Sequence, residues 1–127
     1  MPEREKPKIL LVEDDVFMVD LLVRELVESG FDVAVANSGK EAAQKFGEFK
    51  PDLVLLDLIL PDQSGLETLR QIRRKPRGPE TKVVILSNIG EGKDMEEARR
   101  LGVVDYLVKA NFSLPDIIEK VNSILEK

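Results

Sequence analysis

Short apolar runs alternate with longer amphipathic stretches along the chain. Runs of roughly five residues rich in valine, isoleucine and leucine are typical of buried strands. They predict strands at Ile9–Val12, Asp32–Ala36, Leu53–Leu56, Lys82–Leu86 and Val104–Val108. The stretches between them have helical spacing and predict helices at Val16–Ser29, Lys40–Phe49, Gly65–Arg74, Lys93–Leu101 and Leu114–Glu126. This succession of βα units predicts an α/β fold, a five-stranded parallel sheet with helices on both faces.

Serine residues precede three of the predicted helices. Ser38 and Ser64 are each followed three residues later by glutamate, the pattern of a capping box. Ser113 is followed by Pro115 and Asp116, a weaker form of the same start signal. These signals support the predicted helix starts.

Length and charge narrow the classes of function. The 127 residues suit one domain spanning residues 1–127, and 43% hydrophobic residues are enough for a core. The net charge of -5 argues against direct binding to nucleic acid. A basic patch occurs at Arg73, Arg74, Lys75 and Arg77, but nearby prolines and glycine favour its interpretation as a solvated loop.

Cysteine and histidine are both absent from the sequence. The chain contains no cysteine, which excludes disulfides and thiolate chemistry, and no histidine, which excludes a phosphohistidine or a histidine base of its own. The first residues are charged and lead into a strand too short for a signal-peptide core or a membrane span. We therefore expect a cytoplasmic protein without membrane insertion.

Four of the predicted strands end in polar groups of different kinds. Glu13 and Asp14 follow the first strand, Asp57 the third, Ser87 the fourth, and Lys109 the fifth. The carboxyl ends of parallel strands meet at one edge of the sheet, where ligands of open α/β sheets bind. Carboxylates, a hydroxyl and an ammonium gathered there predict a divalent-metal and phosphoryl site.

The oxygen-rich set suits Mg2+, which prefers carboxylates, backbone carbonyls and water. We expect Asp14 and Asp57 as direct ligands, Glu13 acting through a water, and the backbone carbonyl of Ile59 as a further ligand. With its charge screened, a carboxylate can attack phosphorus and form an aspartyl phosphate. Asp57 is the expected phosphoacceptor.

Lys109 and Ser87 complete the expected chemistry. Phosphoryl transfer depends on positioning and charge neutralisation, so Lys109 would neutralise charge and Ser87 would donate a hydrogen bond to a phosphoryl oxygen. Each residue taken alone has a structural interpretation as a turn aspartate, a helix-dipole acid, a cap serine or a solvated lysine. Their common place at one sheet edge favours the functional interpretation.

With these residues in these places, the chain resembles the receiver domain of two-component response regulators, close to the single-domain chemotaxis type. The resemblance runs from Lys8 to Leu125 and includes LLVEDD at 10–15, DLILPDQSG at 57–65, ILS at 85–87 and DYLVKA at 105–110. It implies the flavodoxin-like strand order 2-1-3-4-5. It also identifies Tyr106 as a switch aromatic that works with Ser87.

The resemblance implies a phosphorelay function. A histidine kinase or phosphotransfer protein would donate the phosphoryl group to Asp57, with Mg2+ as cofactor. Ser87 and Tyr106 would then move, and the surface of the fourth helix, fifth strand and fifth helix would change toward a downstream protein target. Such a protein is no enzyme in the usual sense, although it assists its own phosphorylation and dephosphorylation.

Two residues near the site depart from the family pattern, and two others stand at positions that tune hydrolysis in this family. Ala110 stands where proline, often with a cis peptide bond, usually follows the lysine, so a trans bond is expected. Asn88 stands where a small residue is usual and would narrow or polarise the phosphodonor's approach. Ile59 and Ile89 are bulky and apolar, and we expect them to shield the aspartyl phosphate from water and give a long-lived signal.

The first predicted helix carries two apolar lines. Met18, Leu21, Leu22 and Leu26 are expected to form the core face. A second line, at Val16, Val19, Val23 and Val27, has two interpretations. It would either pack against the last helix or form a surface for docking or for a phosphorylation-dependent homodimer.

Three other functions compete with this prediction. A haloacid-dehalogenase-type phosphatase would need a second aspartate at position 59, where Ile59 stands, and a flavodoxin-like FMN carrier would need a phosphate loop in place of the acids that follow the first strand. The remaining alternative is a receiver-fold interaction module that acts without phosphorylation. Ala110 and Asn88 make that alternative worth testing.

Overall fold

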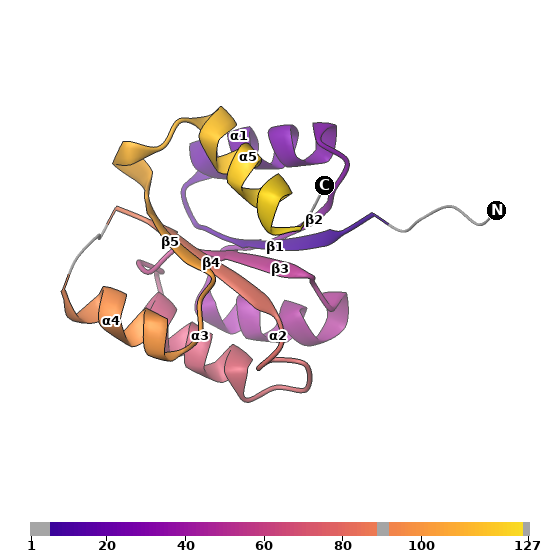
Figure 1. Cartoon of the computed structure of the whole chain (residues 1–127). Coiled ribbons are helices and arrows are strands. Elements are labelled where there is room, and N and C mark those ends of the chain that lie inside the picture. The colour runs from indigo at the N-terminus through magenta and orange to yellow at the C-terminus, as the bar shows by residue number, and fades with distance from the viewer. Residues whose placement is uncertain (1–5, 89–91, 126–127) are drawn as a thin grey trace.

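The structure is a computed structural model that describes residues 6–88 and 92–125. Its strands form one parallel sheet in the order β2-β1-β3-β4-β5 (Figure 1). The strands are β1 (Lys8–Val12), β2 (Asp32–Ala36), β3 (Leu53–Leu56), β4 (Lys82–Ser87) and β5 (Asp105–Val108). This order confirms the predicted fold and places the strand-order reversal at β1 and β3.

Helices cover both faces of the sheet. They are α1 (Val16–Glu28), α2 (Gly39–Phe49), α3 (Gly65–Arg73), α4 (Lys93–Arg100) and α5 (Leu114–Ile124), with a short 3-10 turn, η1 (Lys109–Asn111). In Figure 1, α1 and α5 lie on one face, and α2, α3 and α4 lie on the other. The predicted boundaries agree within one or two residues, and the predicted last helical residue, Glu126, lies outside the described residues.

Two apolar cores fill the space between the sheet and its helices. Successive residues of a strand point to opposite faces, so Leu10 and Val12 join the core under α2, α3 and α4, while Ile9 and Leu11 join the core under α1 and α5. All four side chains are almost completely buried. Burial on both faces explains why the strands are continuous apolar runs, and it makes the sheet a firm base for the polar groups at its edge.

The helix starts show which cap signals were correct. Ser38 and Ser64 each accept a hydrogen bond from the backbone N–H three residues later, as predicted. The reciprocal box forms at Ser113, where Asp116 Oδ2 also accepts the Ser113 N–H at 3.1 Å. Glu41 instead accepts the N–H of Asn37, so the start expected to be weaker is the complete one.

The prediction of a solvated basic loop is wrong for Arg73. Its guanidinium donates to four backbone carbonyls at 2.6–3.0 Å, those of Gly78, Thr81, Leu101 and Gly102. Burial lowers the pKa of this guanidinium. Arg73 therefore ties the end of α3 to the start of β4 and to the end of α4.

The apolar lines of α1 are divided differently from the prediction. Leu22 and Leu26 are buried, but Leu21 is 48% exposed and does not belong to the core face. In the second line, Val19 and Val23 pack against the core under α1 and α5, whereas its two end residues, Val16 and Val27, are exposed. Phe17, which the pattern did not single out, is 82% exposed.

In the described ranges, no helix has the length and apolar character that crossing a membrane would need.

Candidate phosphoryl and metal site

Asp57 lies directly after β3 at the carboxyl edge of the sheet. Its backbone N–H donates to the carbonyl of Val12 at 3.0 Å, which fixes it beside the end of β1. The loop that follows folds back tightly, because Gly65 N–H donates to the Leu58 carbonyl at 2.8 Å. A methyl group at Gly65 would collide with the carbonyl oxygen of Asp57. The loop therefore needs glycine there to hold Asp57 in place.

Donors from three segments surround the Asp57 carboxylate. Ser87 Oγ donates to Asp57 Oδ1 at 3.0 Å, and the Ile59 N–H donates to the same oxygen at 3.2 Å. Lys109 Nζ donates to Asp57 Oδ2 at 3.1 Å. Ser87 is the last residue of β4 and is fully buried, so a hydroxyl inside the strand reaches the site. The strand ends thus meet as the sequence predicted.

The acidic residues gather beside Asp57. Glu13, Asp14 and Asp57 each offer a carboxylate oxygen, and these oxygens all lie within 4.8 Å of one another. Glu13 and Asp57 are buried, at 2% and 6% exposure, while Asp14 is exposed to solvent. Hard oxygen donors at this spacing fit a Mg2+ ion that keeps several waters. One open side toward solvent leaves room for those waters.

The charged groups at this site shift one another's pKa values. Burial raises the pKa of Glu13, and the charge of Asp57 adds to this, while the hydrogen bond from Lys109 opposes it. Burial by itself would lower the pKa of Lys109, but its hydrogen bond to Glu13 and the charge of Asp57 raise it overall. The Lys109 ammonium therefore stays charged, and it is the cation that compensates two buried acids.

Tyr106 lies on β5, paired with Ile85 of β4 in the sheet register. Its side chain is half-buried and packs against the core under α2, α3 and α4. Burial raises the pKa of its phenol, and the charges of Asp94 and Asp57 raise it further. The charge of Asp57 is the smallest of these three influences on the phenol.

The four residues beside the site that the sequence analysis named differ in their exposure and in the elements that carry them. The Lys109–Ala110 peptide bond is trans, as expected, and Ala110 lies in η1. Asn88 is exposed after β4, and Ile59 is 57% exposed in the loop after β3. Ile89 lies outside the described residues. The Ile59 carbonyl as a metal ligand stays a prediction.

Sequence reasoning missed three contacts around the acids. Lys109 Nζ lies 2.6 Å from Glu13 Oε1, an ion pair that was not expected. Asn37 Nδ2 donates to the Glu13 carbonyl at 3.1 Å, and Asp15 caps α1 through the N–H of Phe17 at 3.0 Å. Asn37 follows β2, the one strand whose polar end the sequence analysis did not consider, and that position was the signal that could have revealed the contact.

A comparison with known families agrees with this geometry. The family model described as the response regulator receiver domain matches residues 9–122, nearly all of the chain. The chain belongs to the response regulator receiver domain family. Receiver domains are phosphorylation-based signalling switches and not classical enzymes. They bind Mg2+ at an acidic pocket and interact with histidine kinases and downstream targets.

Curated relatives of this receiver domain are of two lengths. The chemotaxis protein CheY of Listeria monocytogenes is 37% identical over 121 residues, which cover 94% of this chain and 96% of that protein. A CpxR homolog of Haemophilus influenzae, a transcriptional regulatory protein, is 40% identical over 94% of this chain and 51% of its own length. The chain thus spans about half the length of the transcriptional regulators it matches and almost all of CheY.

Solved structures share the receiver fold. The signal receiver domain of a LuxO repressor protein from Vibrio parahaemolyticus has a TM-score of 0.86 at 28% identity, covering 96% of this chain and 92% of that one. The receiver domain of the Francisella response regulator 1452 has a TM-score of 0.84 at 30% identity, covering 95% and 98%. These similarities extend over the sheet and both helical layers.

Proposed function

We propose that this receiver domain accepts a phosphoryl group on Asp57 from a histidine kinase or phosphotransfer protein in the cytoplasm, acting as one unit over residues 1–127. The observation that carries the proposal is the arrangement of donors around the Asp57 carboxylate. Ser87 Oγ holds one oxygen and Lys109 Nζ holds the other. Donors already aimed at this position are what phosphoryl transfer requires.

The transfer itself is a displacement at phosphorus. An Asp57 carboxylate oxygen forms the new O–P bond while the P–N bond to the partner's histidine breaks, and the histidine nitrogen retains the electron pair. Mg2+ held by Asp14, Asp57, the Ile59 carbonyl and, through water, Glu13 would neutralise negative charge on the phosphoryl oxygens. Lys109 and Ser87 then exchange their contacts with the carboxylate for contacts with phosphoryl oxygens.

The proposed signal reaches the surface through Ser87 and Tyr106. When Ser87 moves toward a phosphoryl oxygen, the space above β4 changes, and the half-buried Tyr106 on the next strand can fill it. Movement of Tyr106 alters the surface formed by α4, β5 and α5. This is a shift between two populations that the protein already samples, and a protein target would read it.

An apolar surface beside the site supports docking of the phosphodonor. Val16 and Phe17 begin α1 immediately after the acidic residues, and both are largely exposed. Leu21 continues this surface one turn further along the helix. A kinase or phosphotransfer helix could pack here while its histidine faces Asp57. A homodimer that forms after phosphorylation is the second partner that such a surface would suit.

An interaction module that works without phosphorylation is the alternative function. The observation in its favour is that Lys109 already compensates both Glu13 and Asp57, with contacts of 2.6 and 3.1 Å. Such a module would bind its target in this state and would ignore the phosphodonor.

One titration separates the two functions. Beryllofluoride with Mg2+ mimics an aspartyl phosphate, and backbone NMR would follow its effect on 15N-labelled protein. The proposal predicts shifts around Asp57, Ser87 and Tyr106 that disappear in Asp57→Ala. The shifts should persist in the control Asp20→Asn, whose side chain is exposed on α1. An absence of shifts in the unmodified chain would favour the module.

A further inference from the structure

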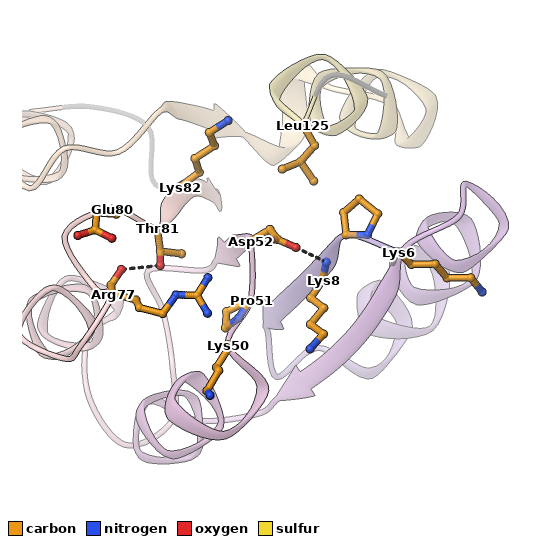
Figure 2. Close-up of a pocket in the computed structure, with 11 residues that line it drawn as sticks. Lys6, Lys8, Lys50, Pro51, Asp52, Arg77, Glu80, Thr81, Lys82 and Leu125 are labelled. Atoms are coloured by element: carbon orange, nitrogen blue, oxygen red, sulfur yellow. Dashed lines mark hydrogen bonds between the residues drawn. The ribbon is translucent and has the colours of Figure 1, made fainter. Parts of the chain in front are cut away.

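A groove of about 600 Å3 lies at the amino ends of the strands, opposite the edge that carries Asp57 (Figure 2). It is formed by the start of β1, the turn between α2 and β3, and the loop between α3 and β4. Its charged lining residues are the cations Lys6, Lys8, Lys50, Arg77 and Lys82 and the acids Asp52 and Glu80. A net positive groove in a chain of net charge -5 points to an anionic ligand.

Some of these charges already have partners. The Asp52 carboxylate accepts the backbone N–H of Lys8 at 2.8 Å, and Lys82 Nζ donates to the Ile124 carbonyl at 3.1 Å. Lys50 and Arg77 form no ion pair with any other residue in the two described ranges. In Figure 2 the side chain of Arg77 extends toward Pro51, on the side away from Glu80. The ammonium groups of Lys6 and Lys8 form no ion pair in these ranges either, and that of Lys8 lies 5.7 Å from the centre of the Phe49 ring. Lys50 and Arg77 are therefore two of several cations in the groove that can meet an anionic ligand.

Lys50 and Arg77 also share an unusual backbone. Their φ angles are 53° and 67°, and within residues 6–88 and 92–125 no other residue except glycine has a positive φ. Lys50 ends α2 at a position that glycine usually occupies, and the Arg77 carbonyl is fixed by Thr81 Oγ1 at 2.8 Å. Glycine would complete both turns with less strain. The turns alone do not explain why both positions carry a cation, and strained residues concentrate at binding sites.

A smaller apolar cavity of about 160 Å3 adjoins the groove at these two residues. Lys50, Pro51, Arg77 and Thr81 line both spaces. The rest of the small cavity is lined by Phe46, Gly47, Lys75 and Pro76. The site thus combines two unpaired cations with an adjacent space walled by aromatic and proline rings.

We propose that this groove binds a small organic polyphosphate of the nucleoside di- or triphosphate class. Arg77 offers a planar fork that matches two phosphate oxygens, and Lys50 adds a second positive charge beside it. The ring system of the ligand enters the cavity next to Phe46 and Pro51. The site is separate from the phosphoacceptor and would bind its ligand whether or not Asp57 is phosphorylated.

The test is an NMR titration of 15N-labelled protein with ATP in the absence of divalent cations, which keeps ATP from bridging to the acidic cluster. ATP is expected to shift the amides of residues 46–52 and 77–82. Tripolyphosphate, which lacks the ring, and adenosine, which lacks the phosphates, are each expected to bind more weakly than ATP. Tripolyphosphate or a polyglutamate peptide that binds as tightly as ATP would overturn the proposal, because it would show a general attraction for polyanions.

Two glycine variants each remove one positive charge of the groove, at positions whose positive φ angles glycine adopts easily. Lys50→Gly and Arg77→Gly are each expected to weaken ATP binding about tenfold, the loss of one charge-assisted contact. Because glycine favours a positive φ, their melting temperatures should be no lower than that of the unmodified protein. The control Arg24→Gln removes one positive charge from an exposed position on α1, away from the groove, and should bind ATP as tightly as the unmodified protein.

The outcome is independent of the phosphoacceptor. Both glycine variants should keep their beryllofluoride response at Asp57, so loss of that response alone would concern the first proposal and not this one. Unchanged ATP affinity in both glycine variants, or no shift near the groove at millimolar ATP, would refute the polyphosphate site.

Discussion

Lys109 Nζ lies 2.6 Å from Glu13 Oε1 and also 3.1 Å from Asp57 Oδ2, so one ammonium joins the ends of β1, β3 and β5. Its side chain is 12% exposed, and the two carboxyl groups are more deeply buried. At such burial the loss of one partner costs more than the pair contributes, because it leaves charge uncompensated. Lys109 therefore has a role in stability as well as in the proposed chemistry.

Replacing Lys109 by methionine should destabilise the protein. We expect Lys109→Met to lower the free energy of unfolding by about 2–4 kcal/mol at pH 7 without added Mg2+, since Glu13 and Asp57 would then repel each other. Urea unfolding measures the change. Addition of Glu13→Gln to this variant should restore part of the loss, and a Lys109→Met protein as stable as the original would contradict the account.

Acid should remove the contribution of the ion pair between Asp105 and Lys120, whose charged atoms lie 2.9 Å apart. Burial by itself would raise the pKa of Asp105, but the hydrogen bonds from Lys120 and from the Tyr106 N–H lower it overall. A lowered carboxyl pKa stabilises the fold above the ordinary aspartate pKa of 3.8, and that contribution disappears as the pH falls through the folded value.

The comparison with Asp105→Asn tests this pH dependence. Both partners are more than one third exposed, so the unmodified protein should exceed the variant by less than about 1 kcal/mol at pH 7. This difference should be smaller at a pH below 3.8 than at pH 7. Urea unfolding at the two pH values measures it, and a difference that does not depend on pH would refute the assignment.

Arg73 should be far more important for stability than its neighbour. Arg73→Met removes donors from four carbonyls and is expected to cost about 2–3 kcal/mol. Arg74→Met is the matched control, because that side chain is exposed, and it should change stability by less than about 0.5 kcal/mol. Thermal and urea unfolding measure both variants. Equal effects of the two substitutions would show that the carbonyl contacts contribute little.

Ile59 should lengthen the lifetime of the aspartyl phosphate. Its side chain is exposed in the loop after β3, where it can lie over a phosphorylated Asp57 and exclude water. Ile59→Ala is expected to speed hydrolysis roughly tenfold, equivalent to about 1.4 kcal/mol in the barrier. Val27→Ala, which also truncates an exposed apolar residue, serves as the control. A half-life no longer than seconds in the unmodified protein with Mg2+ would contradict the shielding by Ile59 and Ile89.

The sequence predicted the sheet because its central strands are buried on both faces and read as continuous apolar runs. It also predicted that Asp57, Ser87 and Lys109 meet, because parallel strands share a carboxyl edge. It could not predict that Leu21 is exposed, since one helix offers several apolar stripes and only the packing of α5 decides which is buried. Arg73 looked like a loop cation because its four carbonyl partners are distant in sequence or lie in irregular backbone.

The groove at the amino ends of the strands could not be predicted from the sequence either, because distant segments form it. Lys50 and Arg77 belong to different turns, and nothing in their local sequence shows that they line one space. Their positive φ angles are also invisible in the sequence, because the residues that usually adopt them are glycine and asparagine. The site arises because the fold brings side chains from different segments together, which no local sequence pattern shows.

The central claim is that Asp57 accepts a phosphoryl group, and intact-protein mass spectrometry tests it most directly. The chain would be incubated with Mg2+ and phosphoramidate, whose P–N bond resembles that of a phosphohistidine, and the modified residue would be located after borohydride reduction. The account predicts one phosphoryl group, located on Asp57, absent from Asp57→Asn and absent when Mg2+ is chelated. A chain that remains unmodified, or a phosphoryl group on another residue, would contradict it.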